Sequence, residues 1–469
     1  MWQVLILFVQ KSINKLLTVD HTIMSMSFKE LALILTLLPA FLACEKEKNL
    51  NVANQSSSFL QKKFFVSKEQ AMALVETLQR NKRTTETNGK EIGDIATFTD
   101  RAGIAIFYVI NFKDNKGHLL LSADKRMKPV LAFSDSGIFD LETDNPGIQL
   151  WKNFIAEHAV GIRGKTEASI DIVNEWRQFE IGQGAGFKTT DQPVWTPEAS
   201  CEYFATHPIP PNVTIQHLTY NVAHWLQGKG YNAHCPNGIV VPNCTKSGIF
   251  PCGKALVGCG PLAIGQVLKF HHKSVTVEGT NYTEAMLNGM PMTHSGDCPP
   301  PDNTGNGNLS HLLRDIGKAT GATYNTVVPA LGVPMSGSGC QTWMEPGKTD
   351  DFFVARGFTS YDLDFFNSAN QTAIKNQLLA QRPVIVYGSN CSACLSNMHM
   401  WVIDGIQDLH AIYQDQNGYC YEYTTYYYQM NWGWANSVQN DTWFAYDNIV
   451  GDGILYNSAN MKAYIIIPN

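Results

Sequence analysis

The sequence feature that most restricts the fold is VGCGPLAIGQVLKFHH, residues 257–272, in which a glycine-bracketed cysteine opens an apolar helical repeat. Pro261 suits the first turn of a helix, where its missing N–H costs nothing, and apolar residues then recur at helical spacing. The pattern predicts a helix with Cys259 at its N-terminus. Unpaired N–H groups and the helix dipole stabilise a thiolate there, so we expect a thiol pKa well below the usual value of about 8.5. The alternative is a buried or disulfide-bonded cysteine.

A thiolate nucleophile needs a base and a group that orients the base. His399 lies in MHMWVIDG, residues 398–405, whose alternation and β-branched content predict a strand that pairs with residues 382–388. Asn431 lies in YYYQMNWGW, residues 426–434, which predicts a further strand. A lone strand histidine or asparagine is usually structural, but the three residue types in this order and context indicate a nucleophile, its base and an orienting amide.

The same chemistry predicts supporting residues. An oxyanion hole needs two donors about 3 Å from the developing charge; the Cys259 backbone N–H is one candidate, and the side-chain amide of Gln227, in HWLQGKGYN, is the other. Trp432 follows Asn431 and is expected to cover the His–Asn hydrogen bond from water. The glycines beside Cys259 are expected to let a substrate backbone approach closely.

Composition excludes several other functions. A net charge of −6 over 469 residues gives no electrostatic argument for nucleic acid or an anionic membrane surface. The sequence has no glycine-rich phosphate loop and no fixed-period repeat. Cys391 and Cys394 form a C-x-x-C pair, but no second pair stands at zinc spacing, so no metal and no cofactor are expected.

The N-terminal region predicts export. Residues 31–43, LALILTLLPAFLA, have the length of a signal-peptide core and are too short to span a bilayer as a helix. Ala43 before Cys44 suggests a bacterial lipobox with Cys44 as the lipidated residue; a simple cleaved signal is the alternative. Met24 or Met26 would start a signal of normal length. The expected location is the cell envelope or surface, or the medium, with a lipid anchor as the sole membrane contact.

Export makes disulfides permissible. Of the 11 cysteines, those other than Cys44 and Cys259 could form up to four bridges and leave one free thiol, with pairing that the sequence does not specify.

Changes in composition divide the chain into a signal with lipobox, a tether, a small α+β unit without a nucleophile constellation of its own, an exposed linker and the domain with the candidate site. The boundaries are 1–44, 45–64, 65–181, 182–199 and 200–469. In the α+β unit, residues 69–80 predict a helix, 107–137 a hairpin turning at 114–117, and a helix starts near Gln149. The linker, rich in Gly, Thr and Pro, is the expected cutting site.

Five motifs resemble, in order, those of the streptopain-like cysteine peptidases, bacterial secreted proteases of the papain clan: WLQGKGYNAHCP, VGCGPLAIGQVLKFHH, RPVIVYG, HMWVIDG and MNWGW. LSADKRMKPVLAFSDSG, residues 121–137, is similar to the end of that family's inhibitory pro-domain. The likeness covers about residues 65–465. It implies an α+β papain-like domain with a helical half and an antiparallel β half, endopeptidase activity on proteins or peptides, and a pro-domain that inhibits its own enzyme. The implied site residues are Cys259, His399, Asn431, Trp432 and Gln227.

The sequence also departs from that family. Asn397 and Met398 stand where the family usually has glycine before its histidine, and Ala435 and Asn436 replace two glycines after the tryptophans. Two other functions therefore remain open: a papain-fold surface binding or inhibitor protein with weakened catalysis, and a thiol-dependent amidase or acyltransferase.

Overall fold

A computed structural model describes residues 63–80, 90–143, 145–169, 172–173, 175–177, 209–237, 251–324, 342–365, 367–389, 398–414, 420–434, 441–445 and 460–469. Residues Phe64–Asn469 belong to one compact unit. The expected signal, lipobox and linker, together with Cys391 and Cys394, lie outside the described residues.

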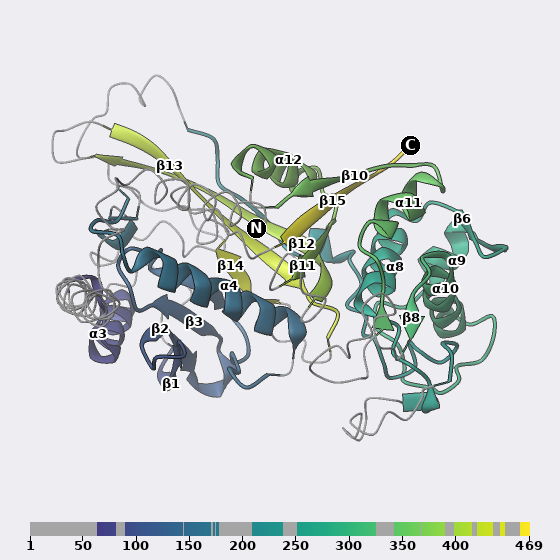
Figure 1. Ribbon diagram of the computed structural model, residues 1–469, viewed down its shortest axis with the longest axis horizontal. Helices are drawn as coiled ribbons and strands as arrows, with labels where there is room; N and C mark the ends of the chain where they lie inside the picture. The colour runs from purple at the N-terminus through teal and green to yellow at the C-terminus, as the bar shows by residue number, and fades with distance from the viewer. Residues whose placement is uncertain are drawn as a thin grey trace, which may run out of the picture. The chain divides into compact units, whose positions relative to one another are not determined.

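An antiparallel sheet extends through this unit, and its described strands come from both halves of the sequence (Figure 1). Their order is β1-β2-β3-β4-β14-β13-β12-β11-β15-β10, and β5 pairs with β12. The strands are β1 (Ile92–Thr99), β2 (Ala105–Phe112), β3 (His118–Ser122), β4 (Val130–Ser134), β5 (Val213–Ile215), β10 (Phe358–Asp364), β11 (Val384–Ser389), β12 (Met398–Gln414), β13 (Cys420–Asn431), β14 (Trp443–Ala445) and β15 (Asn460–Pro468). Two short pairs stand apart, β6 (Val275–Val277) with β7 (Thr280–Tyr282) and β8 (Thr323–Tyr324) with β9 (Thr342–Trp343).

The described elements of the N-terminal half include the first four strands and two helices. The expected hairpin is present as β2 and β3, joined through the 3-10 turn η2 (Lys113–Asn115). The predicted first helix is α3 (Lys68–Arg80). The second, α4 (Pro146–Ile162), starts three residues before the expected position because Asn145 caps it: Asn145 Oδ1 accepts from the backbone N–H of Gly147 at 2.9 Å.

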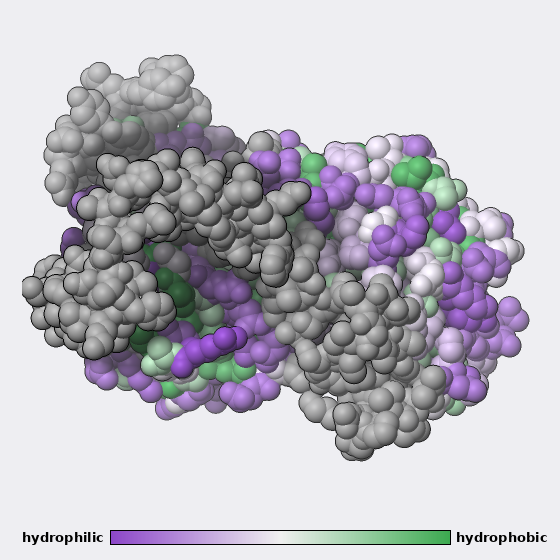
Figure 2. Space-filling view, viewed as in Figure 1, coloured by the Kyte–Doolittle hydropathy of each residue, from purple (hydrophilic) through white to green (hydrophobic). Residues whose placement is uncertain are grey.

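In the C-terminal half, α8 (Cys259–His271) packs on α10 (Gly305–Ala319) and on β12. The remaining elements are α7 (His217–Tyr220), η3 (Pro251–Gly253), α9 (Glu284–Gly289), α11 (Lys348–Val354) and α12 (Ser368–Leu379). On the face seen in Figure 2, hydrophilic residues predominate over α9 to α11, and hydrophobic ones appear in small patches. The predicted α+β class, with a helical part and an antiparallel sheet, is confirmed.

The two halves share one sheet through β4 and β14. Phe133 of β4 pairs with Trp443 of β14 in antiparallel register, and His118 Nε2 lies 3.1 Å from the Thr442 hydroxyl. The strands of the N-terminal half therefore extend the sheet that carries His399 and Asn431.

Cysteine pairing is partly visible. Cys252 and Cys298 form a disulfide, Cys420 is also disulfide-bonded, and Cys235 and Cys259 are free. In the part of the chain that the structure describes, no helix is both long and apolar enough to cross a bilayer.

Candidate active site

Cys259 begins α8, as the sequence predicts. Gly258 holds a left-handed backbone with φ of 92°, and its carbonyl oxygen accepts the first helical hydrogen bond, from Leu262 N at 3.1 Å. A Cβ at Gly258 would lie 2.9 Å from Thr342 Cγ2, and one at Gly260 would lie 2.6 Å from Met344 Cε. In this structure, the two glycines thus allow β9 and the residue after it to pack closely on the start of the helix.

The environment of the Cys259 thiol differs from the expected one. Burial raises the pKa of this thiol above its ordinary value, although hydrogen bonds from the backbone of Met400, Gly260 and Cys259 itself act in the opposite direction. The expectation of a lowered pKa is therefore wrong for this form of the protein, because loss of water around the sulfur outweighs the helix N-terminus.

His399 lies in β12, and the predicted strand pair is confirmed, with His399 opposite Gly388 of β11. The residue is 2% exposed, and its Nε2 lies 2.8 Å from the carbonyl oxygen of Trp432. A carbonyl only accepts, so Nε2 carries the proton and donates. Burial lowers the pKa of His399 to about 4, despite this hydrogen bond. Among the described residues, none of the hydrogen bonds of His399 reaches Cys259 or Asn431.

The alternation of β12 explains this arrangement. Successive strand side chains point to opposite faces, so His399 and Trp401 share one face and Met400 lies on the other. The rings of His399 and Trp401 stack with centroids 6.0 Å apart. The thiol of Cys259 interacts with the Met400 backbone and with Tyr387, the residue opposite Met400. Both α4 and α8 contact β12, and Figure 1 shows them on either side of β11 and β12.

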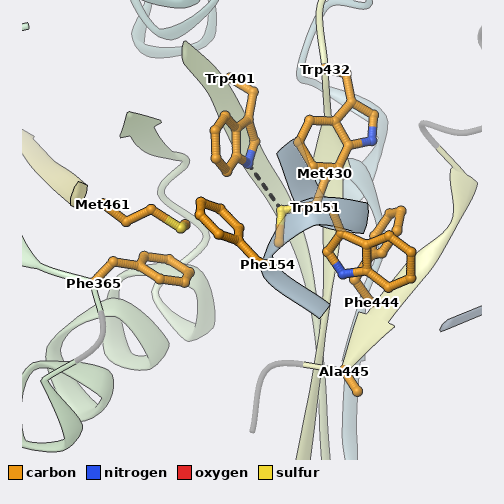
Figure 3. A pocket seen from close by; sticks show the side chains of 9 residues that line it. All are labelled: Trp151, Phe154, Phe365, Trp401, Met430, Trp432, Phe444, Ala445 and Met461. Atoms are coloured by element: carbon orange, nitrogen blue, oxygen red, sulfur yellow. Dashed lines mark hydrogen bonds between the residues drawn. The ribbon is translucent and has the colours of Figure 1, made fainter. Parts of the chain in front are cut away.

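Helix α4 of the N-terminal half covers the face of β12 that carries His399. A Cβ at Gly147 would collide with the ring of Trp432, and one at Gly388 would lie 2.8 Å from Leu150 Cδ2. Trp151 and Phe154 of α4 face an apolar pocket lined also by Phe365, Trp401, Met430, Trp432, Phe444, Ala445 and Met461 (Figure 3). In the same view, Trp401 Nε1 donates to Met430 Sδ at 3.1 Å.

Asn431 ends β13 and is fully buried. Its Nδ2 donates to the carbonyl of Ala223 at 3.1 Å, and its Oδ1 accepts from Gln266 Nε2 at 3.3 Å. Gln266 Nε2 also donates to Ala223 O at 2.7 Å. Sequence reasoning missed Gln266; the available signal was a polar residue among the apolar residues of α8.

Gln227 is buried, and its carbonyl accepts from the backbone N–H of Val257 at 3.0 Å. This bond holds the Gln227 segment against the residues that lead into Cys259. Trp432 is 1% exposed and stacks near His399, with ring centroids 6.5 Å apart. The structure thus brings Gln227 beside the start of α8 and Trp432 beside His399, whereas the His–Asn bond expected under Trp432 is absent among the described contacts.

Comparison with known proteins gives two matches along the chain. Residues 63–159 match the Spi protease inhibitor family, and residues 225–444 match the peptidase C10 family. No curated protein sequence matches the chain. Among solved structures, a fragment of Prevotella intermedia prointerpain A has 17% sequence identity and a TM-score of 0.47, over 79% of this chain and 98% of that chain. Active interpain A cysteine protease from the same organism has 18% identity and a TM-score of 0.32, over 54% of this chain and 94% of that chain.

Proposed function

The chain belongs to the peptidase C10 (streptopain) family and carries a Spi-type inhibitor domain ahead of its peptidase domain, and on that premise we propose that Cys259 and His399 are its catalytic pair. It is a cysteine-type peptidase with its own inhibitor in the same chain. Cys259 attacks the scissile carbonyl and forms an acyl-enzyme. His399 takes the thiol proton and returns it to the leaving amine.

The other site residues have supporting roles in this proposal. Asn431 orients the His399 ring, and Trp432 shields that contact from water. The Cys259 backbone N–H and the Gln227 amide stabilise the oxyanion. The hydrogen bond between Gln227 O and Val257 N supports this assignment, because it keeps the amide-bearing residue beside the nucleophile.

One observation supports latency most directly: His399 donates to the Trp432 carbonyl on the face that α4 covers. A histidine held there makes no hydrogen bond to Cys259 among the described residues, so it is not placed to take the thiol proton. The raised pKa of the Cys259 thiol also favours latency, because little of the nucleophilic thiolate forms. Removal of α4 uncovers Trp432 and allows the start of β12, which carries His399, to rearrange so that the ring reaches Cys259.

Maturation follows from this arrangement. Cutting within residues 182–199 converts a tethered inhibitor at high effective concentration into a dilute one, which then dissociates.

The proposed location is the bacterial cell envelope, with Cys44 as the lipidated residue, or the medium after simple signal cleavage. The hydrophobic run at 31–43 supports export.

The test is incubation of purified precursor, wild type beside Cys259→Ala, followed by mass spectrometry and a casein digest. We expect the wild type to lose about its first 180–200 residues and then digest casein, while the variant remains intact and inactive. Labelling of Cys259 by iodoacetamide without casein cleavage would instead indicate an amidase or acyltransferase. A processed protein that neither labels nor digests would indicate a binding protein.

A further inference from the structure

Two histidines and an aspartate converge away from the catalytic pair. His217 begins α7, His224 follows that turn, and Asp404 stands in β12 at the irregularity in its pairing with β13. His217 Nδ1 lies 3.1 Å from Asp404 Oδ2 and 3.1 Å from His224 Nε2. His224 Nε2 lies 3.7 Å from the same carboxylate oxygen. Three ligand atoms of the types that bind transition metals therefore form one small triangle.

The distances between the three ligand atoms fit a cation with tetrahedral coordination. Zinc binds histidine nitrogen and carboxylate oxygen at about 2.0–2.2 Å, which puts neighbouring ligand atoms about 3.3–3.5 Å apart. The three observed separations surround that value. Hydrogen bonds explain the triangle less well, because 3.7 Å is too long for one and a single proton on His217 Nδ1 must be shared between two acceptors.

The opposite nitrogen of His217 has the partner that a metal ligand needs. His217 Nε2 lies 3.1 Å from Asp441 Oδ1, and a carboxylate on the outer N–H commonly fixes the tautomer of a metal-bound histidine. With the proton on Nε2, the lone pair of Nδ1 points at the triangle. The backbone N–H of His217 also donates to Gln429 Oε1 at 3.1 Å, which fixes the ring's position further.

Asp404 supplies a second, independent indication of a ligand. Its side chain is 0% exposed, and within the described residues its Oδ1 has no hydrogen-bond partner. A buried carboxylate oxygen without a partner is costly, and a cation bound at Oδ2 would compensate the charge of the whole group. Asp404 and Asp441 together balance a divalent ion.

We propose that His217, His224 and Asp404 bind one divalent transition-metal ion, with Zn²⁺ the best fit, as a structural site of the peptidase domain. The side chain of His224 is 26% exposed, which leaves the fourth position to water and gives the ion a way in. This site departs from the sequence-based expectation of no metal, because its ligands come from segments almost 190 residues apart rather than from a local motif.

The ion would stabilise a segment that has few other attachments. Segment 213–224 pairs with β12 through the three-residue strand β5. All four residues of α7 have positive φ, between 41° and 65°. This segment follows the proposed cutting region and would lie near the new N-terminus after maturation. A metal bridge from α7 to β12 would keep it in place.

The test uses the full-length Cys259→Ala precursor, which has neither the catalytic thiol nor self-cleavage. The protein is stripped with EDTA, given excess Zn²⁺, dialysed, and analysed for zinc by atomic emission and for its unfolding temperature. We expect about one retained zinc per chain at a protein concentration well above a typical site's Kd, with a higher unfolding temperature. Co²⁺ in place of zinc should give the strong visible absorption of a tetrahedral site.

His224→Ala should lose both the zinc and the gain in unfolding temperature; its circular dichroism without metal verifies that it folds. His311→Ala is the matched control, because His311 belongs to a different histidine cluster with Asp302 and His234 and is about as exposed. It should keep the zinc. Absence of zinc from the parent, equal zinc in His224→Ala, or loss of zinc in His311→Ala alone would overturn the proposal. None of these readouts depends on peptidase activity.

Discussion

His399 Nε2 donates a 2.8 Å hydrogen bond to the carbonyl oxygen of Trp432. The bond ties the proposed base to the residue against which Gly147 of α4 packs. The contact between inhibitor helix and peptidase and the position of the base are therefore parts of one arrangement. A change at either end should alter latency.

Gly147→Ala should weaken latency. A Cβ at this position collides with the Trp432 ring, and overpacking of this kind costs typically 1–3 kcal/mol. We expect peptidase activity of the uncut precursor to rise about tenfold, and its processing to accelerate. Initial rates on a fluorogenic peptide, read before cleavage appears on a gel, measure this. Gly164→Ala is the control, because a Cβ there has no neighbour within 4 Å. Both variants give the same mature enzyme after cleavage. Equal peptidase rates of the two uncut precursors would therefore refute the proposal that α4 maintains latency through Trp432.

Gln227→Ala should lower kcat of the processed enzyme by roughly 10²–10³ with a smaller change in KM, the pattern of a lost oxyanion donor. Steady-state kinetics on one peptide substrate decide this. Unchanged kcat would mean that the second donor is another group. Processing in trans by a small amount of wild-type enzyme supplies the mature variant.

Asn431→Ala should leave weaker but measurable activity, because an orienting group contributes less than the nucleophile. Cys259→Ala and His399→Ala should abolish it. The comparison of kcat/KM across these processed enzymes tests the assigned roles. Asn431→Ala as inactive as Cys259→Ala would contradict the assignment of Asn431 as an orienting residue only.

Gln266→Leu tests the hydrogen bond that sequence reasoning missed. Gln266 is buried, and it bonds to Ala223 O and Asn431 Oδ1. Its removal takes this donor away from the buried Asn431 Oδ1, whereas Ala223 O still accepts from Asn431 Nδ2. One unsatisfied buried acceptor costs about 1–3 kcal/mol. Urea unfolding of the Cys259→Ala precursor with and without the substitution measures the loss. No change in stability would show that water replaces the amide.

Acid should lower the stability of the precursor through His118, which lies where the inhibitor and peptidase parts share the sheet. Burial lowers the pKa of His118 to about 3 from its usual 6.5, and its ring contacts Thr442 beside β14. The folded state keeps His118 neutral while the unfolded state takes up a proton, so stability is lost as pH falls from about 6.5 toward 3. At pH 5 this one group costs about 2 kcal/mol.

The measurement is the urea midpoint of the Cys259→Ala precursor at pH 7.5 and pH 5. His118→Gln, which cannot gain a proton, should show a smaller decrease between the two pH values. His399 and His271 also have pKa values lowered to about 4 by burial, and they act in the same direction in both proteins. If the urea midpoint decreased equally with and without His118, this residue would have no part in the loss of stability in acid.

Local patterns were enough to predict much of the chain. The helix at Cys259, the hairpin around residues 114–117 and the strand pair at His399 are confirmed because each depends on neighbours close in sequence or on strong periodicity. The Cys, His and Asn residue types and their order also belong to the sequence itself. They identify the chemistry of which this chain is capable.

Packing between distant segments decided whether these residues stand in an active or a latent arrangement. The sequence alone does not reveal that α4 covers Trp432, that His399 hydrogen-bonds to the Trp432 carbonyl rather than to Cys259, or that burial raises the Cys259 pKa. The triangle of His217, His224 and Asp404 is likewise invisible until β5 pairs with β12. A pattern of residues sets which side chains exist and which local elements form, whereas contacts of a few ångströms between elements far apart in sequence arise only when the whole sheet and its helices pack together.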